Sequence, residues 1–361
     1  MPDYRATGTC FDLLFFILLR YSRQQANHQP HPNRPQHPFA RPLPRTFFLL
    51  LPAMNTHLKL LGVAILWGAS WPWGRMVAQA LPPITAAAMR FALAALGLLI
   101  WLGCSKKGWH TVRALSTRQW LGLAVAAACG VFGYALFFML GLQYVSASRG
   151  AVVITMNPAL TLLLAAWLFK ERLNAAIILG MLLAIGGALT AITQGQVLQF
   201  FAGGIKSGEV LLLGCVICWA AYTLIGRALL QGIDALTATT ITAAIGAIML
   251  AAGSLLFEGA RAWQHIAQTP ASAWWALIAL ALATTTVAYA WYFDGVKVLG
   301  AGNAATYITL VPVFGVMISA LWLHEPLPAT LVLGGLVAVV GMALMQWGQM
   351  QARPNKKSML R

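Results

Sequence analysis

Charged residues are scarce in this chain, and acidic residues are the scarcest. Only 9% of its 361 residues are charged, with 8 Asp and Glu against 24 Lys and Arg, while 60% are hydrophobic. A soluble domain carries about 25% charged residues, so this composition excludes an ordinary soluble protein. Almost every stretch of about 20 residues after Met54 is apolar enough to span a bilayer as a helix. Because polarity does not alternate along these stretches, as it would in a transmembrane barrel, we predict an all-α polytopic membrane protein.

Carboxylates are missing from the middle of the apolar stretches. After Met54, every Asp and Glu lies near the end of a predicted span. Proton-driven pumps typically hold a titratable carboxylate within the membrane. Its absence argues against proton antiport through a carboxylate and favours a facilitated or otherwise coupled carrier.

Catalytic and cofactor motifs are missing as well. The chain has no phosphate-binding glycine loop and no metal-binding spacing, so we expect no catalytic residue, no cofactor and no metal. The histidines after Met54 lie near span ends, which leaves a membrane-embedded enzyme without an acid, a base or a nucleophile at a shared depth. Cys215 and Cys218 form a CxxC inside an apolar span, where two small residues one turn apart are the simpler interpretation. The five cysteines show no paired framework.

The apolar stretches predict ten transmembrane helices. Short connections with turn residues such as Pro82-Pro83 separate them. Their approximate ranges are 58–78, 84–103, 119–140, 147–169, 173–193, 208–230, 236–257, 272–293, 301–323 and 327–347.

One 33-residue stretch occurs twice. Gly141 to Leu173, shifted by 154 residues, matches Gly295 to Leu327 at nine positions, among them Pro158 with Pro312. A proline inside a span removes one backbone hydrogen bond and frees a carbonyl, here that of Ile154 in the first copy. Paired interrupted spans in corresponding halves are the best sequence indication of a transporter's substrate site.

The repeat divides the chain into two halves of five spans each. Trp67–Gln79 and Trp219–Gln231 also match, at an offset of 152. Since five is odd, the second half enters the membrane upside down relative to the first. We therefore predict two inverted five-helix repeats, at 54–195 and 208–347, with the substrate site between them.

Positive charge orients the chain. With the N-terminus inside, 13 Lys and Arg fall in cytoplasmic segments against two to four outside. This bias places both termini in the cytoplasm, including a basic tail at 348–361. The net charge of +16 therefore does not indicate a nucleic-acid partner.

Residues 1–53 stand outside the repeat. They are rich in Pro, His, Gln and Arg between Gln24 and Arg45, and such a segment cannot build a core. We interpret Met54 as the start of the protein and 1–53 as translated upstream sequence. A disordered cytoplasmic leader is the alternative.

Three sequence segments together resemble the EamA-type branch of the drug/metabolite transporter superfamily. They are LLGVAILWGASWPWGR in the first span, AAMRFALAAL in the second and NPALTLLLAAWLFKERL at the end of the fourth. The resemblance covers Met54 to about Gln346. It implies a secondary transporter of the cytoplasmic (inner) membrane that moves small metabolites, often amino acids or their derivatives, usually outward and by alternating access.

The resemblance also implies partners and a location for the site. Spans 1, 3, 4, 6, 8 and 9 would line a central cavity, while spans 5 and 10 would be peripheral and pack between the protomers of a homodimer. The implied partners are a small-molecule substrate and the lipid bilayer. A multidrug efflux carrier is the alternative function, whereas a carrier of nucleotide sugars or organic phosphates would need several basic groups facing the cavity.

Aromatic and polar residues in the cavity spans are the candidate binding residues. Trp67 and Trp71 share one helix face, so they either line the cavity or pack in the core. Asn157 lies at mid-depth, where an unpartnered amide is costly, so it bonds across helices or contacts substrate. The candidates for substrate binding are Trp67, Ser70, Trp71, Tyr134, Phe138, Asn157, Trp219, Tyr222, Tyr289, Tyr292, Asn303 and Tyr307. The candidate bending points are Pro72, Pro158 and Pro312.

Five charged residues are interpreted as structural. Arg90 lies deepest, and we favour a role at the interface or at a neighbouring helix end over contact with a substrate carboxylate. Arg75 and Arg227 occupy equivalent ends of the first and sixth spans, and recurrence in both halves favours a structural role. Glu171 and Glu325 end the fourth and ninth spans, where a carboxylate can accept N–H bonds from the start of the next helix.

Overall fold

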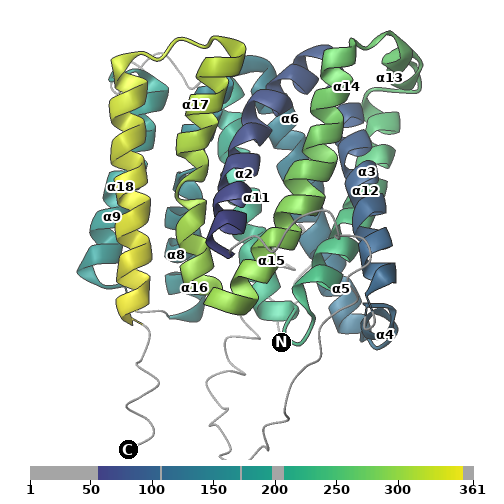
Figure 1. The fold of residues 1–361 in the computed structure, drawn as a ribbon, viewed down its shortest axis with the longest axis horizontal. Coiled ribbons are helices and arrows are strands. Elements are labelled where there is room, and N and C mark those ends of the chain that lie inside the picture. Colours follow the sequence, from purple (N-terminus) through teal and green to yellow (C-terminus); the bar gives the residue numbers. More distant parts are fainter. Residues whose placement is uncertain (1–55, 106–107, 171–172, 197–206, 353–361) are drawn as a thin grey trace, which may run out of the picture.

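The part of the chain that the structure describes folds into an all-helical bundle (Figure 1). The structure is a computed structural model, and the described residues are 56–105, 108–170, 173–196 and 207–352. Its elements are α2 (Thr56–Ala80), α3 (Pro83–Cys104), α4 (Gly108–Arg113), α5 (Thr117–Ala127), η1 (Ala128–Gly133), α6 (Tyr134–Tyr144), α7 (Ala147–Val153), α8 (Met156–Phe169), α9 (Ala175–Thr193), α11 (Ser207–Leu229), α12 (Ala235–Phe257), α13 (Arg261–Gln264), η2 (His265–Gln268), α14 (Ala271–Ile278), η3 (Ala279–Val287), α15 (Ala288–Leu299), α16 (Ala301–Ile308), α17 (Val311–Leu323) and α18 (Ala329–Ala352).

Three predictions fall at least partly outside these residues. The leader 1–53 and Glu171 are not described, and the predicted tail is described only as far as Ala352, where α18 ends.

Among the described residues, nine helical segments are long and apolar enough to cross a membrane, against the ten predicted for the whole chain. The exception is α2, which is 25 residues long but less apolar because it carries Ser70, Pro72 and Arg75. Most helix ends agree with the predicted spans to within a few residues. The segment predicted as 272–293 continues to Leu299.

Two of the segments are broken at corresponding places. Helix α7 stops at Val153 and α8 starts at Met156, while α16 stops at Ile308 and α17 starts at Val311. Each break lies just before the proline that the repeat singled out. The carbonyl of Ile154, which Pro158 was expected to free, accepts the N–H of Asn157 at 3.0 Å instead. The break is therefore closed by a tight turn of the backbone.

Two further segments contain π-helical turns that the repeat did not predict. They are η1 between α5 and α6, and η3 between α14 and α15. A π-helical turn displaces the backbone hydrogen bonds of a helix and often marks a functional site. In η3 the carbonyl of Thr284 accepts the indole N–H of Trp67 at 3.0 Å. This bond joins the first membrane helix of one half to the centre of the other half.

The first long helix of each half packs against helices of the other half, an arrangement that we call the exchange of helices. Helix α2 of the first half packs against α15 and α17 of the second half, and α11 of the second half packs against α6 and α8 of the first half. At the crossing of α2 and α17 a Cβ on Gly68 would lie 2.6 Å from the Cβ of Phe314. The most extensive contacts between the halves pair α9 with α18 and α3 with α12.

Glycines bring α9 and α18 into close contact at one side of the bundle (Figure 1). A Cβ on Gly187 would lie 2.5 Å from the backbone of Ala338, and one on Gly180 would lie 2.7 Å from the carbonyl of Gly341. Small residues let helices approach closely in a membrane, where packing replaces the hydrophobic effect between helices.

Candidate functional site

A cavity of about 850 Å³ lies between the two halves. Its walls come from both π-helical segments and from α2, α3, α6, α8, α9, α11, α12, α15, α16, α17 and α18. The volume falls within the range of about 300–1,000 Å³ that small-molecule sites occupy. The cavity is therefore large enough for a metabolite and is completed only when both halves are present.

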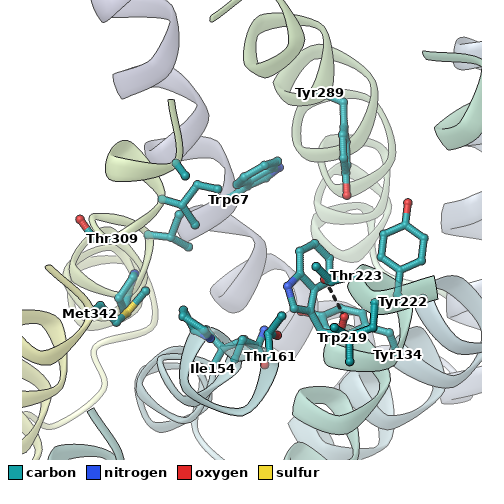
Figure 2. Close-up of a pocket in the computed structure, with 18 of the residues that line it drawn as sticks. Trp67, Tyr134, Ile154, Thr161, Trp219, Tyr222, Thr223, Tyr289, Thr309 and Met342 are labelled. Carbon is teal, nitrogen blue, oxygen red and sulfur yellow. Dashed lines mark hydrogen bonds between the residues drawn. The ribbon is translucent and has the colours of Figure 1, made fainter. Parts of the chain in front are cut away.

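Aromatic side chains form much of the wall (Figure 2). Trp67 lies with its ring centroid 5.5 Å from that of Tyr289 in an edge-on arrangement. Across the cavity, Trp219 lies 5.8 Å from both Tyr134 and Tyr222. Figure 2 shows the Tyr222 and Tyr289 rings entering the cavity from different helices. Rings arranged in this way give a ligand several flat apolar surfaces and the phenol hydroxyls of three tyrosines.

Arg90 lies at the cavity wall rather than at the membrane interface. Its side chain is 8% exposed, and its Nε and Nη1 atoms have no hydrogen-bond partner. The guanidinium lies over the rings of Phe91 and Phe138, at 5.1 and 5.5 Å from their centroids. Of the two structural roles favoured from the sequence, reach to the interface does not fit this buried side chain. The other role, at a neighbouring helix end, finds no support among the described residues, because Nε and Nη1 donate to no helix-end carbonyl.

Helix α8 contributes two polar groups one turn apart. Asn157 is 8% exposed and its Oδ1 has no hydrogen-bond partner, and the hydroxyl of Thr161 is likewise buried and unpartnered. Both line the cavity, as does Pro158 between them. The sequence left two roles open for Asn157, a hydrogen bond across helices or contact with substrate. Among the described residues, its Oδ1 accepts no hydrogen bond from another helix.

The predicted binding residues divide into two groups. Eight of them line the cavity: Trp67, Ser70, Trp71, Tyr134, Asn157, Trp219, Tyr222 and Tyr289. Four do not line it: Phe138, Tyr292, Asn303 and Tyr307.

Each of these four has a different surrounding. Phe138 is buried behind the wall, with its ring centroid 5.1 Å from that of Trp71. Tyr292 packs against Trp67, with 5.4 Å between their ring centroids. Asn303 is exposed and donates to the carbonyl of Leu299. Tyr307 pairs through its hydroxyl with His57 at 2.6 Å. Asn303 and Tyr307 therefore lie on a different face of α16 from Ala305 and Ile308, which do line the cavity.

The predicted bending points also divide. Pro158 and Pro312 line the cavity at the two breaks, whereas Pro72 is buried within an unbroken α2.

Threonines are cavity residues that the sequence analysis did not identify. The threonines that line the cavity are Thr161, Thr223, Thr239, Thr242, Thr284, Thr285 and Thr309.

The cavity extends toward the end of the bundle at which the described chain begins and ends (Figure 1). Its lining there includes Arg227 in the last turn of α11, Gln349 near the end of α18 and Leu173 before α9. The guanidinium of Arg227 lies 4.5 Å from the ring centroid of Phe169.

Two carboxylates join the halves at the opposite end. Glu325, after α17, accepts the backbone N–H groups of Ala147 and Ser148 at 2.8 Å each. These groups begin α7, so the predicted kind of contact is present but with a helix of the other half instead of the following helix. Glu258, after α12, accepts the N–H groups of Ile84 and Thr85 at 2.8 and 2.7 Å, at the start of α3. We call these two contacts the carboxylate clamps.

Arg75 supports one of the carboxylate clamps. Its Nε lies 3.6 Å from Glu325, and its Nη1 donates to the carbonyls of Leu142 and Val145 at the end of α6. Arg75 and Arg227 occupy matching places in the repeat, yet only Arg227 lines the cavity. A cation at a helix C-terminus is stabilised by the last carbonyls, which suits Arg75 to a structural role.

The described residues offer no group of three or more His, Cys, Asp or Glu that could hold a metal ion. Within the same residues, the cavity wall contains two arginines but no Asp, Glu, His or Lys. The arrangement is suited to binding a small organic molecule between aromatic rings.

Comparison with known proteins agrees with this arrangement. A model of the EamA-like transporter family matches residues 54–193 and again residues 206–347. The chain is 31% identical over 291 residues to the "Uncharacterized transporter YyaM" of Bacillus subtilis, covering 80% of this chain and 92% of that protein. It is 28% identical to an "Uncharacterized transporter" of Archaeoglobus fulgidus, covering 80% and 96% of the two chains. A solved structure titled only "Crystal structure of protein" has a similar fold, with a TM-score of 0.52 and 21% identity over 81% of this chain and 96% of that one.

Proposed function

Because this chain belongs to the EamA-like transporter family, we propose that it is a secondary transporter that exports small metabolites, such as amino acids or their derivatives, across the inner membrane. Transport proceeds by alternating access, in which the two halves rock around the cavity between them. The chain performs no chemistry on its substrate.

The observation that carries this proposal is the composition of the cavity wall. Both broken helices and both π-helical segments meet there, with Pro158 and Pro312 at the breaks. Broken helices in corresponding places of two halves are typical of transporter substrate sites. A cavity built by both halves changes shape when the halves move relative to each other, as alternating access requires.

The proposal includes α2 as a tenth membrane helix and an inverted relation between the halves. Three pairs of features support that relation: the breaks, the π-helical segments, and the exchanged helices α2 and α11. Ten crossings return the chain to its starting side, and the Lys and Arg bias assigns that side to the cytoplasm. The cavity then opens toward the cytoplasm, and the carboxylate clamps close the outer end.

Metabolite profiling of cells and medium tests the proposal. We expect overproduction of the protein to raise the amount of one group of metabolites in the medium and to lower it in the cells. Trp67→Ala and Asn157→Ala should abolish this effect at unchanged protein levels, because both residues line the cavity. Trp120→Ala is the matched control, since Trp120 is 40% exposed near the start of α5. Identical profiles in cells with and without the protein would contradict export.

A further inference from the structure

Arg90 is a buried cation that no described residue neutralises. Two of its nitrogens are buried without a hydrogen-bond partner, and the ion pairs of the described residues do not include it. Its close neighbours are the rings of Phe91 and Phe138. Cation–π contacts recover only part of what a charge loses on leaving water. An anion that reaches this side chain from the cavity would be bound through charge-assisted hydrogen bonds.

The described wall of the cavity has no negative charge to balance Arg90. Among the described residues of its wall the other charged side chain is Arg227, which lies at the mouth over Phe169. The interior therefore has a net positive charge when it is empty. A ligand with one negative charge neutralises it, a zwitterion leaves it unchanged, and a cation increases it.

Several neutral polar groups of the cavity offer acceptor oxygens. The hydroxyls of Thr223, Thr242 and Thr284 donate to carbonyls of their own helices, which leaves their oxygen lone pairs for a ligand. The unpartnered Oδ1 of Asn157 is a further acceptor. A matching ligand therefore carries an N–H or O–H donor in addition to its anionic group.

We propose that Arg90 is the anion-binding residue of the cavity and that the ligand is a small organic carboxylate of net charge −1, with a flat apolar body and at least one N–H or O–H donor. This inference rests on the proposed function and narrows its substrate class. An amino acid whose amine is acylated fits each requirement. A free amino acid brings an ammonium group for which the described wall offers no carboxylate, and a cationic drug meets only positive charge.

A series of ligands with one skeleton and three charges tests the proposal. N-acetylphenylalanine, phenylalanine and phenylalaninamide carry charges of −1, 0 and +1 and share the phenyl ring. Binding to the purified protein can be followed by tryptophan fluorescence, because Trp67, Trp71 and Trp219 line the cavity. We expect affinity to fall in that order, by about tenfold or more at the first step. Equal or tighter binding of phenylalaninamide would overturn the proposal.

Arg90→Met separates ligand binding from a structural role. It should weaken the binding of N-acetylphenylalanine by about 10- to 100-fold, the range expected for loss of a charged hydrogen-bonded contact. It should also raise the unfolding temperature of the ligand-free protein, because a buried charge without a counter-ion is removed. Arg118→Met is the matched control, since Arg118 is exposed at the start of α5, and it should change neither value. A lowered unfolding temperature in Arg90→Met with unchanged binding would assign Arg90 to structure and refute the proposal.

Failure of this inference is distinct from failure of the proposed function. If overproduction still exports metabolites in a Trp67-dependent way but N-acetylphenylalanine does not bind, the carboxylate assignment is wrong and the transporter assignment stands. Binding of N-acetylphenylalanine that depends on Arg90, without any export, would support the anion site and contradict the exporter.

Discussion

Replacing Glu325 with glutamine tests whether the carboxylate clamps hold the outer end of the cavity closed. The carboxylate accepts the N–H groups of Ala147 and Ser148 and the hydroxyl of Ser148, at 2.8, 2.8 and 2.6 Å. Glutamine has nearly the same shape, but it carries no charge and turns one acceptor oxygen into a donor. The change therefore acts on the clamp while leaving the surrounding packing in place.

The size of the effect follows from these contacts. A hydrogen bond to a charged group contributes about 1.5–3 kcal/mol against about 0.5–1.5 kcal/mol for a neutral one. A charge at a helix N-terminus adds roughly 0.3–2 kcal/mol. Glu325→Gln should therefore destabilise the closed outer end by roughly 2–4 kcal/mol, which changes the ratio of closed to open molecules by roughly 30- to 800-fold.

Labelling of a cysteine in the cavity measures this ratio. Ser70, a wall residue near the middle of α2, is changed to cysteine in a variant without its native cysteines. A membrane-impermeant thiol reagent is then added from the outside of intact cells. We expect Glu325→Gln to raise the labelling rate at least tenfold, because Ser70 becomes reachable from that side.

Asp234→Asn is the matched control for Glu325→Gln. Asp234 also accepts a backbone N–H, that of Thr237 at 3.0 Å, but it caps its own helix at the other end of the bundle. It should leave the labelling rate unchanged. Equal labelling in the wild type and in Glu325→Gln would show that the clamp does not determine closure at that end.

Three further predictions concern separate contacts. Glu258→Gln should also raise the labelling rate of the cysteine at position 70 from the outside. Since the two clamps bind different helices, the free-energy effect of the double change should be close to the sum of the two single effects. No effect in either single variant or in the pair would refute the clamp model. Gly187→Ala should lower the unfolding temperature of the purified protein, because its Cβ would lie 2.5 Å from the backbone of Ala338, whereas Gly186→Ala, with no neighbour within 4 Å, should not; equal effects would contradict the close packing of α9 and α18. Trp67→Phe should keep more export than Trp67→Ala, because it retains a ring against Tyr289 and loses only the bond to Thr284; equal loss in metabolite export assays would show that the hydrogen bond, not the ring, is essential.

The sequence predicted the helices and the breaks well, since both follow from local features. Apolar length determines a membrane helix, and a proline such as Pro158 or Pro312 removes a backbone hydrogen bond, although Pro72 leaves α2 unbroken. Repetition of the same pattern 154 residues later made the breaks stand out. The π-helical segments escaped prediction because neither Ala128–Gly133 nor Ala279–Val287 contains a proline or any other fixed signal.

The candidate site was predicted less well, because the direction of a side chain depends on packing between helices. Eight aromatic and polar candidates reach the cavity. Asn303 and Tyr307 do not, since α16 turns Ala305 and Ile308 toward the cavity instead. Arg90 was assigned to the interface or to a neighbouring helix end from its distance to the helix end alone. Only the neighbouring rings of Phe91 and Phe138 show that it turns inward. The sequence predicted that Glu325 accepts hydrogen bonds from the start of the following helix. Its partners, Ala147 and Ser148, lie 178 and 177 residues away.

The exchange of helices has a consequence for the order in which the chain is made. Helix α2 is among the first described parts to leave the ribosome, yet Trp67 bonds to a carbonyl 217 residues further on. Its packing partners α15 and α17 are synthesised near the end of the chain. Until then α2 has only its partners within the first half, such as α6 and α7. Folding of this protein therefore includes a late step, in which α2 gains its contacts with the completed second half.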